Sequence, residues 1–110
     1  MNKSADATLP LPVSRALRKF GADIKTARLK RGFTAKMMAE RLDINRETYA
    51  KVEQGRPSVN LGVYAFALFV LGFGTPFADV ADQRRDEAGL LLDQERMPKR
   101  VRPKKEPQPL

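Results

Sequence analysis

The chain has 110 residues, and its 21 lysines and arginines outweigh 13 acidic residues to give a net charge of +8 at pH 7. This charge favours an anionic partner, either nucleic acid or an acidic membrane surface. The sequence has no cysteine and no histidine, which excludes disulfides and thiol chemistry and removes the usual zinc ligands and the commonest general base. We therefore expect a cytoplasmic protein that is not an enzyme and needs no metal or cofactor.

No signal peptide or membrane segment is expected. The first ten residues lack an apolar run before a small-residue cleavage site. The longest apolar stretch, residues 61–74, is shorter than the ~20 residues that a membrane-spanning helix needs, and three glycines interrupt it. A buried helix is the better interpretation of this stretch.

The N-terminal part of the chain predicts a flexible arm followed by a long helix. Residues 1–12 are polar and then interrupted by prolines. From Val13 to Ala27 apolar residues recur every three or four positions, as on one face of a helix. Gly32 follows two basic residues that suit a helix C-terminus. We therefore predict a helix over residues 13–31.

Two short, capped helices follow. Thr34 is placed to cap the segment AKMMAERL, which breaks at Asp43. Asn45 is placed to cap the segment RETYAKVE, which ends before Gly55 and Pro57. Two short helices joined by so tight a turn predict a helix-turn-helix motif.

The remaining elements are a strongly apolar helix and a weaker C-terminal extension. Residues 61–71 predict a helix that is apolar nearly all round, and such a helix must be covered on more than one side. Thr75 and Pro76 are typical of the start of a short fifth helix, and one or two further helical turns are expected within residues 86–96. The segment 97–110 combines prolines with clustered lysine and arginine, so it is expected to be disordered in isolation.

These elements predict an all-α fold with five helices and flexible N- and C-terminal tails. Residues 1–12 are assigned to the N-terminal arm and residues 13–75 to a helix-turn-helix domain. Residues 76–96 are assigned to a C-terminal helical extension, and residues 97–110 to a basic tail.

The third predicted helix has an outward polar face. At about 100° per residue, Tyr49 and Val52 face one side. The other positions spread over the rest of the helix: Arg46, Glu47, Thr48, Ala50 and Lys51. On a lone helix such a face is simply solvated. Here the helix follows another at helix-turn-helix spacing in a strongly basic chain, so the face is a candidate contact surface.

The segment ADIKTARLKRGFTAKMMAERLDINRETYAKVEQG, residues 22–55, resembles the helix-turn-helix of the phage-repressor (Xre/Cro/C1) family. It shares the family's pattern of Arg in the first helix, Thr before the second, Ala-Glu-Arg-Leu, a turn, a polar third helix and a closing Glu-x-Gly. The likeness covers residues 22–74. It implies a lambda-repressor-like fold whose third helix lies in the major groove of double-stranded DNA.

Carried over by position, the resemblance implies that the third helix reads bases. Arg46 and Lys51 would donate to guanine O6 and N7, and Glu47 would accept from cytosine N4. Thr48 would lie near bases or phosphate. The adjacent Arg46 and Glu47 could instead neutralise each other.

The starts of the second and third helices are candidate contacts to the DNA backbone, because backbone N–H groups at helix N-termini favour phosphate. The candidate residues at these starts are Thr34, Ala35, Lys36 and Asn45, and Arg56, just past the third helix, fits the same role. Ala35 stands where the family usually has Gln, which leaves that contact open. Asp43 stands where glycine is common, but Asp tolerates a left-handed conformation, so the turn is expected to survive.

The resemblance also implies an ion pair between Arg28 and Glu53 that links the first helix to the end of the third. Its role would be structural rather than direct contact with DNA. The alternative is two separate surface charges, which would contribute little to stability.

A symmetric dimer is expected, because one domain in one groove makes few contacts and two half-sites lie about 34 Å apart. Four apolar residues of the fourth helix are expected to face the core: Leu61, Tyr64, Ala65 and Leu68. The other apolar side chains are the expected dimer interface: Val63, Phe66, Ala67, Val70 and Phe73. The alternative is that residues 76–92 fold back over them.

The basic tail has two interpretations. Such a run is usually a solubilising or linker segment. Its five cations could also contact phosphates and order on DNA or on a protein partner: Lys99, Arg100, Arg102, Lys104 and Lys105.

Residues 57–73 and 81–100 resemble small regulators encoded beside HipA-type kinases. That resemblance implies a HipB-like antitoxin, a cytoplasmic and nucleoid-associated homodimer that binds a palindromic operator, represses its own operon and binds a HipA-like kinase toxin. One alternative is a stand-alone phage-type repressor without a toxin partner. Another is a basic protein that binds nucleic acid or an acidic membrane surface through charge alone.

Overall fold

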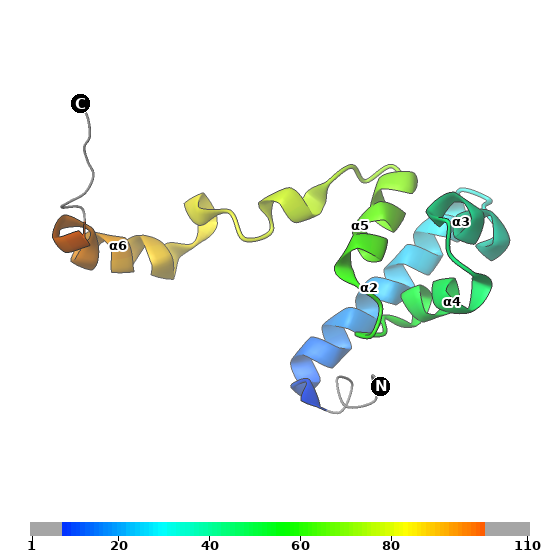
Figure 1. Ribbon diagram of the computed structural model, residues 1–110, viewed down its shortest axis with the longest axis horizontal. Helices are drawn as coiled ribbons and strands as arrows, with labels where there is room; N and C mark the ends of the chain where they lie inside the picture. Colours follow the sequence, from blue (N-terminus) through cyan, green and yellow to red (C-terminus); the bar gives the residue numbers. More distant parts are fainter. Residues whose placement is uncertain (1–7, 101–110) are drawn as a thin grey trace. The chain divides into compact units, whose positions relative to one another are not determined.

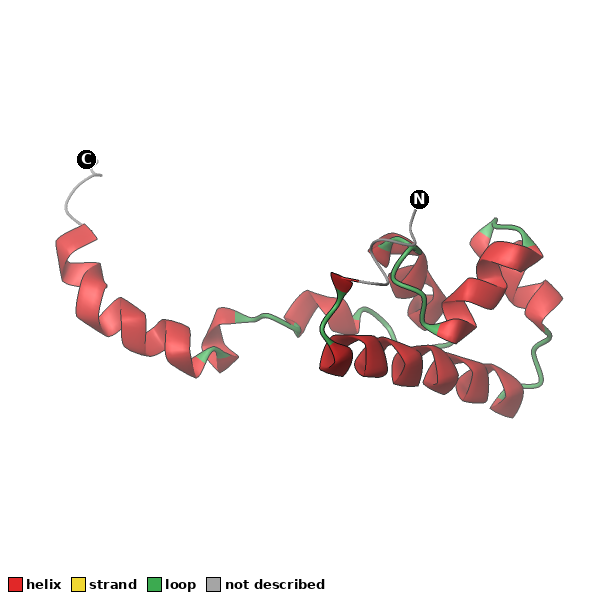
Figure 2. Ribbon diagram, turned by 90° about the horizontal axis from the view of Figure 1, so that it is seen from below, coloured by secondary structure: helices red, strands yellow, loops and turns green. Residues whose placement is uncertain are grey.

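The computed structural model of the protein describes residues 8–100, and all the regular structure in this range is helical (Figures 1 and 2). The elements are α2 (Leu11–Lys30), α3 (Ala35–Leu42), α4 (Arg46–Gln54), α5 (Leu61–Val70), the 3-10 turns η1 (Pro76–Asp79) and η2 (Gln83–Arg85), and α6 (Glu87–Arg100). The predicted all-α fold class is therefore confirmed. The chain divides into two compact units, Met1–Pro76 and Phe77–Leu110.

Helix α2 begins at Leu11, inside the segment expected to be a flexible arm. Pro12 does not prevent this, because it lies in the first turn, where a backbone N–H has no helical partner to lose. The apolar stripe is buried only from the middle of the helix onward, with Ile24 1% exposed and Val13 43% exposed. The part of the predicted arm formed by residues 1–7 lies outside the described residues.

Side-chain caps start α3 and α4 where the sequence placed them. The hydroxyl of Thr34 accepts a hydrogen bond from the backbone N–H of Met37 (3.0 Å), and the Asn45 amide oxygen accepts one from that of Thr48 (2.7 Å). Between the helices, Asp43 adopts the left-handed conformation with φ 57°. The prediction that aspartate supports this turn in place of glycine is confirmed.

Two glycines allow α2 and α4 to approach at backbone distance. A Cβ atom on Gly21 would lie 2.7 Å from the carbonyl oxygens of both Val52 and Glu53. Gly55 ends α4 with φ 69°, and a Cβ there would overlap the carbonyl group of Leu17. The C-terminus of α4 therefore rests directly on the backbone of α2.

One aliphatic and aromatic core holds the first unit together, with α4 packed on α2 and α3, and α3 on α5 (Figure 1). The largest fully buried side chains are Tyr49, Ile24, Met38 and Val52. Each contributes roughly 1.5–3 kcal/mol through removal of apolar surface from water. The Tyr64 hydroxyl donates to the carbonyl oxygen of Arg56 (2.7 Å), which ties α5 to the loop that follows α4.

The register of α5 differs from the expected one. Ala67, expected at a dimer interface, is fully buried within its own unit, whereas Leu61, expected in the core, is 60% exposed. The buried stripe is formed by positions i, i+3, i+4 and i+7, which are Tyr64, Ala67, Leu68 and Leu71. Because α5 is apolar nearly all round, the sequence alone did not reveal which stripe faces inward.

In the second unit, the expected fifth helix is replaced by the short 3-10 turns η1 and η2. The carboxylate of Asp82 starts η2 by accepting from the backbone N–H of Arg84 (2.8 Å), a local interaction that favours a turn over a continuous helix. Helix α6 continues to Arg100, which differs from the disorder expected from residue 97 onward. The segment includes good helix formers. The rest of that tail, residues 101–110, lies outside the described residues.

Within residues 8–100, no helix combines the length and the apolar character needed to cross a bilayer.

Candidate nucleic-acid interface

The outward face of α4 is the strongest candidate contact surface. Arg46, Glu47 and Ala50 are exposed, and Lys51 is half-buried beside them. Tyr49 and Val52 are 1% and 0% exposed, so the inward pair predicted from the sequence is confirmed. The helix therefore presents a polar row to the outside.

Two further residues of α4, Thr48 and Gln54, lie at or beside the outward row. Thr48 is half-buried toward the flank of the row, and its backbone N–H is occupied by the Asn45 cap. Gln54, which the sequence interpretation did not include, is exposed. Its spacing of eight from Arg46 and four from Ala50 places it on the same face. This helical spacing is the sequence signal that could have identified Gln54 as part of the row.

The row carries the functional groups needed to read base edges. Arginine and lysine donate to guanine, glutamate accepts from cytosine, glutamine pairs with adenine, and an alanine methyl contacts the thymine methyl. Within residues 8–96, for which side chains are described, no ion pair joins Arg46 to Glu47. Both side chains are exposed to the outside.

The five candidate backbone contacts fall into different groups. The side chains of Thr34 and Asn45 are engaged in capping, so each could offer a phosphate mainly its backbone. Lys36 is exposed at the start of α3, while Ala35 beside it is half-buried and has no side-chain donor. Arg56 is half-buried just after α4, and its guanidinium lies 3.5 Å from the Gln54 amide oxygen.

Glu53 fastens α4 to α2. Its carboxylate accepts from the Arg28 Nε (2.6 Å) and Nη2 (3.2 Å) and from the Tyr49 hydroxyl (2.5 Å). Arg28 also donates through Nη1 to the carbonyl oxygen of Phe33 (2.9 Å). The Arg28 and Glu53 side chains are only 10% and 12% exposed, so they form a bidentate, mostly buried ion pair rather than two surface charges.

The acid–base behaviour of this cluster reflects the same contacts. The hydrogen bond to Glu53 raises the pKa of Arg28. Burial, followed by the hydrogen bond to Glu53, raises the pKa of Tyr49. Both groups therefore keep their protons at neutral pH.

Two capped helices joined by a tight left-handed turn, with the second presenting a polar row, define a helix-turn-helix unit. A family model described as a helix-turn-helix domain matches residues 19–82. The match covers more than half of the chain, and the protein belongs to the helix-turn-helix domain family. It is therefore a DNA-binding regulator. Comparisons with curated proteins and with solved structures returned no match.

Proposed function

We propose that the protein is a sequence-specific transcriptional repressor of the phage-repressor (Xre/Cro/C1) type, in which α4 enters the major groove of operator DNA. The observation that carries this proposal is the outward row of α4 on a helix held by Glu53 and by the Gly21–Gly55 contact. A helix backbone fixed in this way holds the outward row in one orientation on the domain, which lowers the ordering cost of specific base contacts. The DNA-binding domain would be residues 13–75, with residues 76–96 as its helical extension.

Within this proposal, Arg46 and Lys51 donate to guanines and Glu47 accepts from cytosine. Thr48, half-buried at the flank of the row, would contact the edge of the groove. Lys36 and Arg56 would contact phosphates through their side chains, while Thr34, Ala35 and Asn45 would do so through the backbone at helix starts.

The protein would act as a homodimer on a palindromic operator. Three phenylalanines of α5 and the residues after it support this, because Phe66, Phe69 and Phe73 are 44%, 60% and 52% exposed. Phe66 and Phe69 are spaced at i and i+3 and so share one face of α5. Phe73 lies beyond the end of the helix, after Gly72 with φ 96°, and its ring lies under the guanidinium of Arg31. Val63 and Val70 are half-buried and would contribute their exposed edges, whereas Ala67 would take no part.

The particular role we propose is that of a HipB-like antitoxin that represses its own operon and binds a HipA-like kinase toxin. The support is the likeness of residues 57–73 and 81–100 to small regulators encoded beside such kinases. A protein with this role works in the cytoplasm, on the nucleoid. Co-purification from cells that carry the neighbouring genes tests the point, and recovery of the homodimer alone would favour a stand-alone phage-type repressor.

Selection of bound fragments from random duplex DNA tests the central proposal. We expect an inverted repeat with half-sites about one helical turn apart. Arg46→Ala or Lys51→Ala should then reduce the preference for the selected duplex over a shuffled one by roughly 5- to 100-fold. Arg85→Ala removes one positive charge from the second unit and should leave the preference unchanged.

A protein that binds nucleic acid or acidic membranes through charge alone gives a different result. All three alanine variants would then weaken binding to every duplex equally, and shuffled DNA would compete as well as selected DNA. Either result would contradict the operator-reading role of α4.

A further inference from the structure

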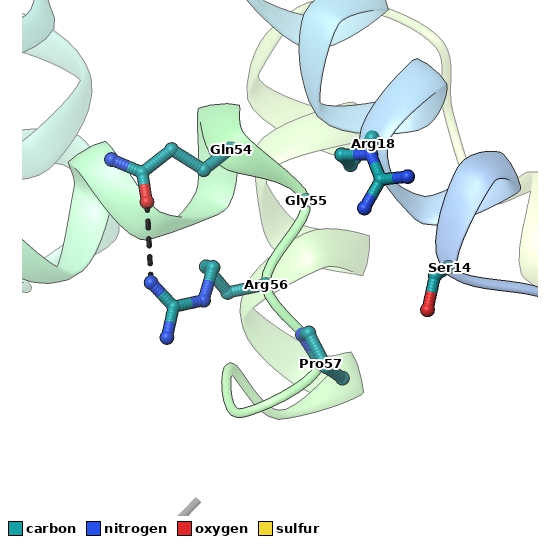
Figure 3. A pocket seen from close by; sticks show the side chains of 6 residues that line it. All are labelled: Ser14, Arg18, Gln54, Gly55, Arg56 and Pro57. Atoms are coloured by element: carbon teal, nitrogen blue, oxygen red, sulfur yellow. Dashed lines mark hydrogen bonds between the residues drawn. The ribbon is translucent and has the colours of Figure 1, made fainter. Parts of the chain in front are cut away.

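A pocket of about 190 Å³ lies between the first half of α2 and the end of α4. Figure 3 shows Ser14 and Arg18 of α2 on one side and the turn from Gln54 to Pro57 on the other. The lining residues are Ser14, Arg18, Gln54, Gly55, Arg56 and Pro57. At about 30 Å³ per water molecule, the space holds a phosphate group together with some of its hydration.

The glycine contact between α2 and α4 creates this pocket. Gly55 rests on the backbone of α2 at Leu17 and Arg18. The turn after α4 therefore lies next to the Arg18 side chain. Ser14 lies one helical turn before Arg18 and faces the same way. Any side chain at position 55 would push these two groups away from Arg56.

The lining is suited to an anion. It contains two guanidinium groups, a hydroxyl and a side-chain amide, and no carboxylate. Arginine forks match the tetrahedral oxygens of phosphate and bind them with charge-assisted hydrogen bonds. In Figure 3 the Arg56 guanidinium is turned toward the Gln54 oxygen, 3.5 Å away. That contact is long and exposed.

The pocket also lies where a DNA strand would pass. Gln54 belongs both to the pocket lining and to the outward face of α4, so the pocket marks the C-terminal end of the row that begins at Arg46. That row spans about 12 Å at 1.5 Å per residue, close to the ~12 Å width of the major groove. A strand bordering a groove filled by α4 would therefore present a phosphate at the pocket.

We propose that Ser14 and Arg18, together with Arg56, form a binding site for a backbone phosphate of DNA. This inference rests on the proposed function, since it takes α4 as the helix in the groove. It adds the first helix, from which the sequence interpretation drew no DNA contact. The site would set the position of the helix-turn-helix along the groove without reading sequence.

Salt-dependent binding of the full chain to selected and shuffled duplexes tests the site. Arg18→Gln should weaken binding to both duplexes about tenfold and lower the salt slope by about one, while the preference between them stays unchanged. Ser14→Ala should have a smaller effect in the same direction. Lys30→Gln removes an exposed charge from the same helix, about 18 Å further along its axis, and should change the slope less.

Duplexes with single phosphates replaced by neutral methylphosphonates identify the contact directly. Replacement of one particular phosphate should weaken DNA binding by the unaltered protein. The same replacement should not weaken binding by Arg18→Gln, because that variant already lacks the side chain that contacts this phosphate. The site would be overturned if every methylphosphonate weakened binding of Arg18→Gln as much as it weakened binding of the unaltered protein. It would also be overturned if Arg18→Gln and Lys30→Gln gave the same salt slope. Failure to discriminate selected from shuffled DNA would instead overturn the proposed function, because a phosphate contact persists on any sequence.

Discussion

Both units of the chain are helical, but they differ in what holds their helices. In the first unit, a glycine-mediated backbone contact, a bidentate ion pair and a common core join α2, α3, α4 and α5. In the second, no residue between 77 and 96 is buried, and its Asp82–Arg84 ion pair is local. Four of its large apolar side chains are 43–68% exposed: Val80, Leu90, Leu91 and Leu92.

The contrast shows that helix formation and domain stability have separate origins here. Caps and helix propensity suffice to define α6, whereas α4 is placed by residues more than 20 positions away. A helix that must present side chains to DNA needs the second kind of support, because local signals determine where it starts but not where it points. The following predictions test this difference between the units.

The largest effect is expected at the contact between α2 and α4. Gly55→Ala combines a positive φ with overlap of the Leu17 carbonyl and should destabilise the first unit by more than about 3 kcal/mol. Gly32→Ala is the matched control, since φ is +70° there but nothing lies within 4 Å of the added Cβ, and it should cost about 1 kcal/mol. Thermal unfolding followed by circular dichroism measures both, and equal losses would contradict the role assigned to the close contact.

The ion pair gives the next largest effect. Glu53→Gln leaves the guanidinium of Arg28 mostly buried without its charged partner and should destabilise the first unit by about 2 kcal/mol. Asp23→Asn breaks the exposed pair between Lys19 and Asp23 and should change stability by less than about 0.5 kcal/mol. Urea unfolding distinguishes the two, and a small effect at Glu53 would mean that α4 is held without the pair.

Alkaline pH should weaken the first unit specifically. Burial raises the pKa of Tyr64 to about 12 and also raises that of Tyr49, whereas an unfolded tyrosine loses its proton near pH 10. The stabilisation is therefore complete below pH 10 and is lost as the pH rises toward 12. Denaturant midpoints measured between about pH 8 and 11 should fall above pH 10, and Tyr64→Phe should flatten the decline. A midpoint independent of pH would show that these hydroxyls titrate normally.

The smallest change in stability is expected on the exposed face of α5. Phe69→Ser removes a side chain that is 60% exposed and should alter the stability of an isolated protomer by less than about 0.5 kcal/mol. If two copies pair through this face, the same variant should shift the protein from dimer to monomer in sedimentation experiments. Leu91→Ser, an equally exposed position in the second unit, is the matched control. A dimer unaffected by Phe69→Ser would place the pairing surface elsewhere.

Much of the helix-turn-helix could be predicted from the sequence, because its signals are local. Thr34 and Asn45 act on backbone groups three residues away, and Asp43 determines the turn by its own conformation. The inward orientation of Tyr49 and Val52 follows from helical periodicity within a polar segment. The same reasoning was wrong for Ala67 and Leu61, since a helix with apolar residues all round has no periodic contrast to interpret.

The sequence by itself determined where the helices of the first unit lie along the chain and which face of α4 is polar, because those properties depend on residues within about four positions of one another. Only the tertiary structure decided which stripe of α5 is buried, how Glu53 fastens α4, and that Ser14 and Arg18 meet Arg56 in one pocket. The last two features depend on how α2 and α4 cross. The crossing rests on Gly21 and Gly55, two residues whose lack of a side chain becomes informative only when the opposing backbone is in place.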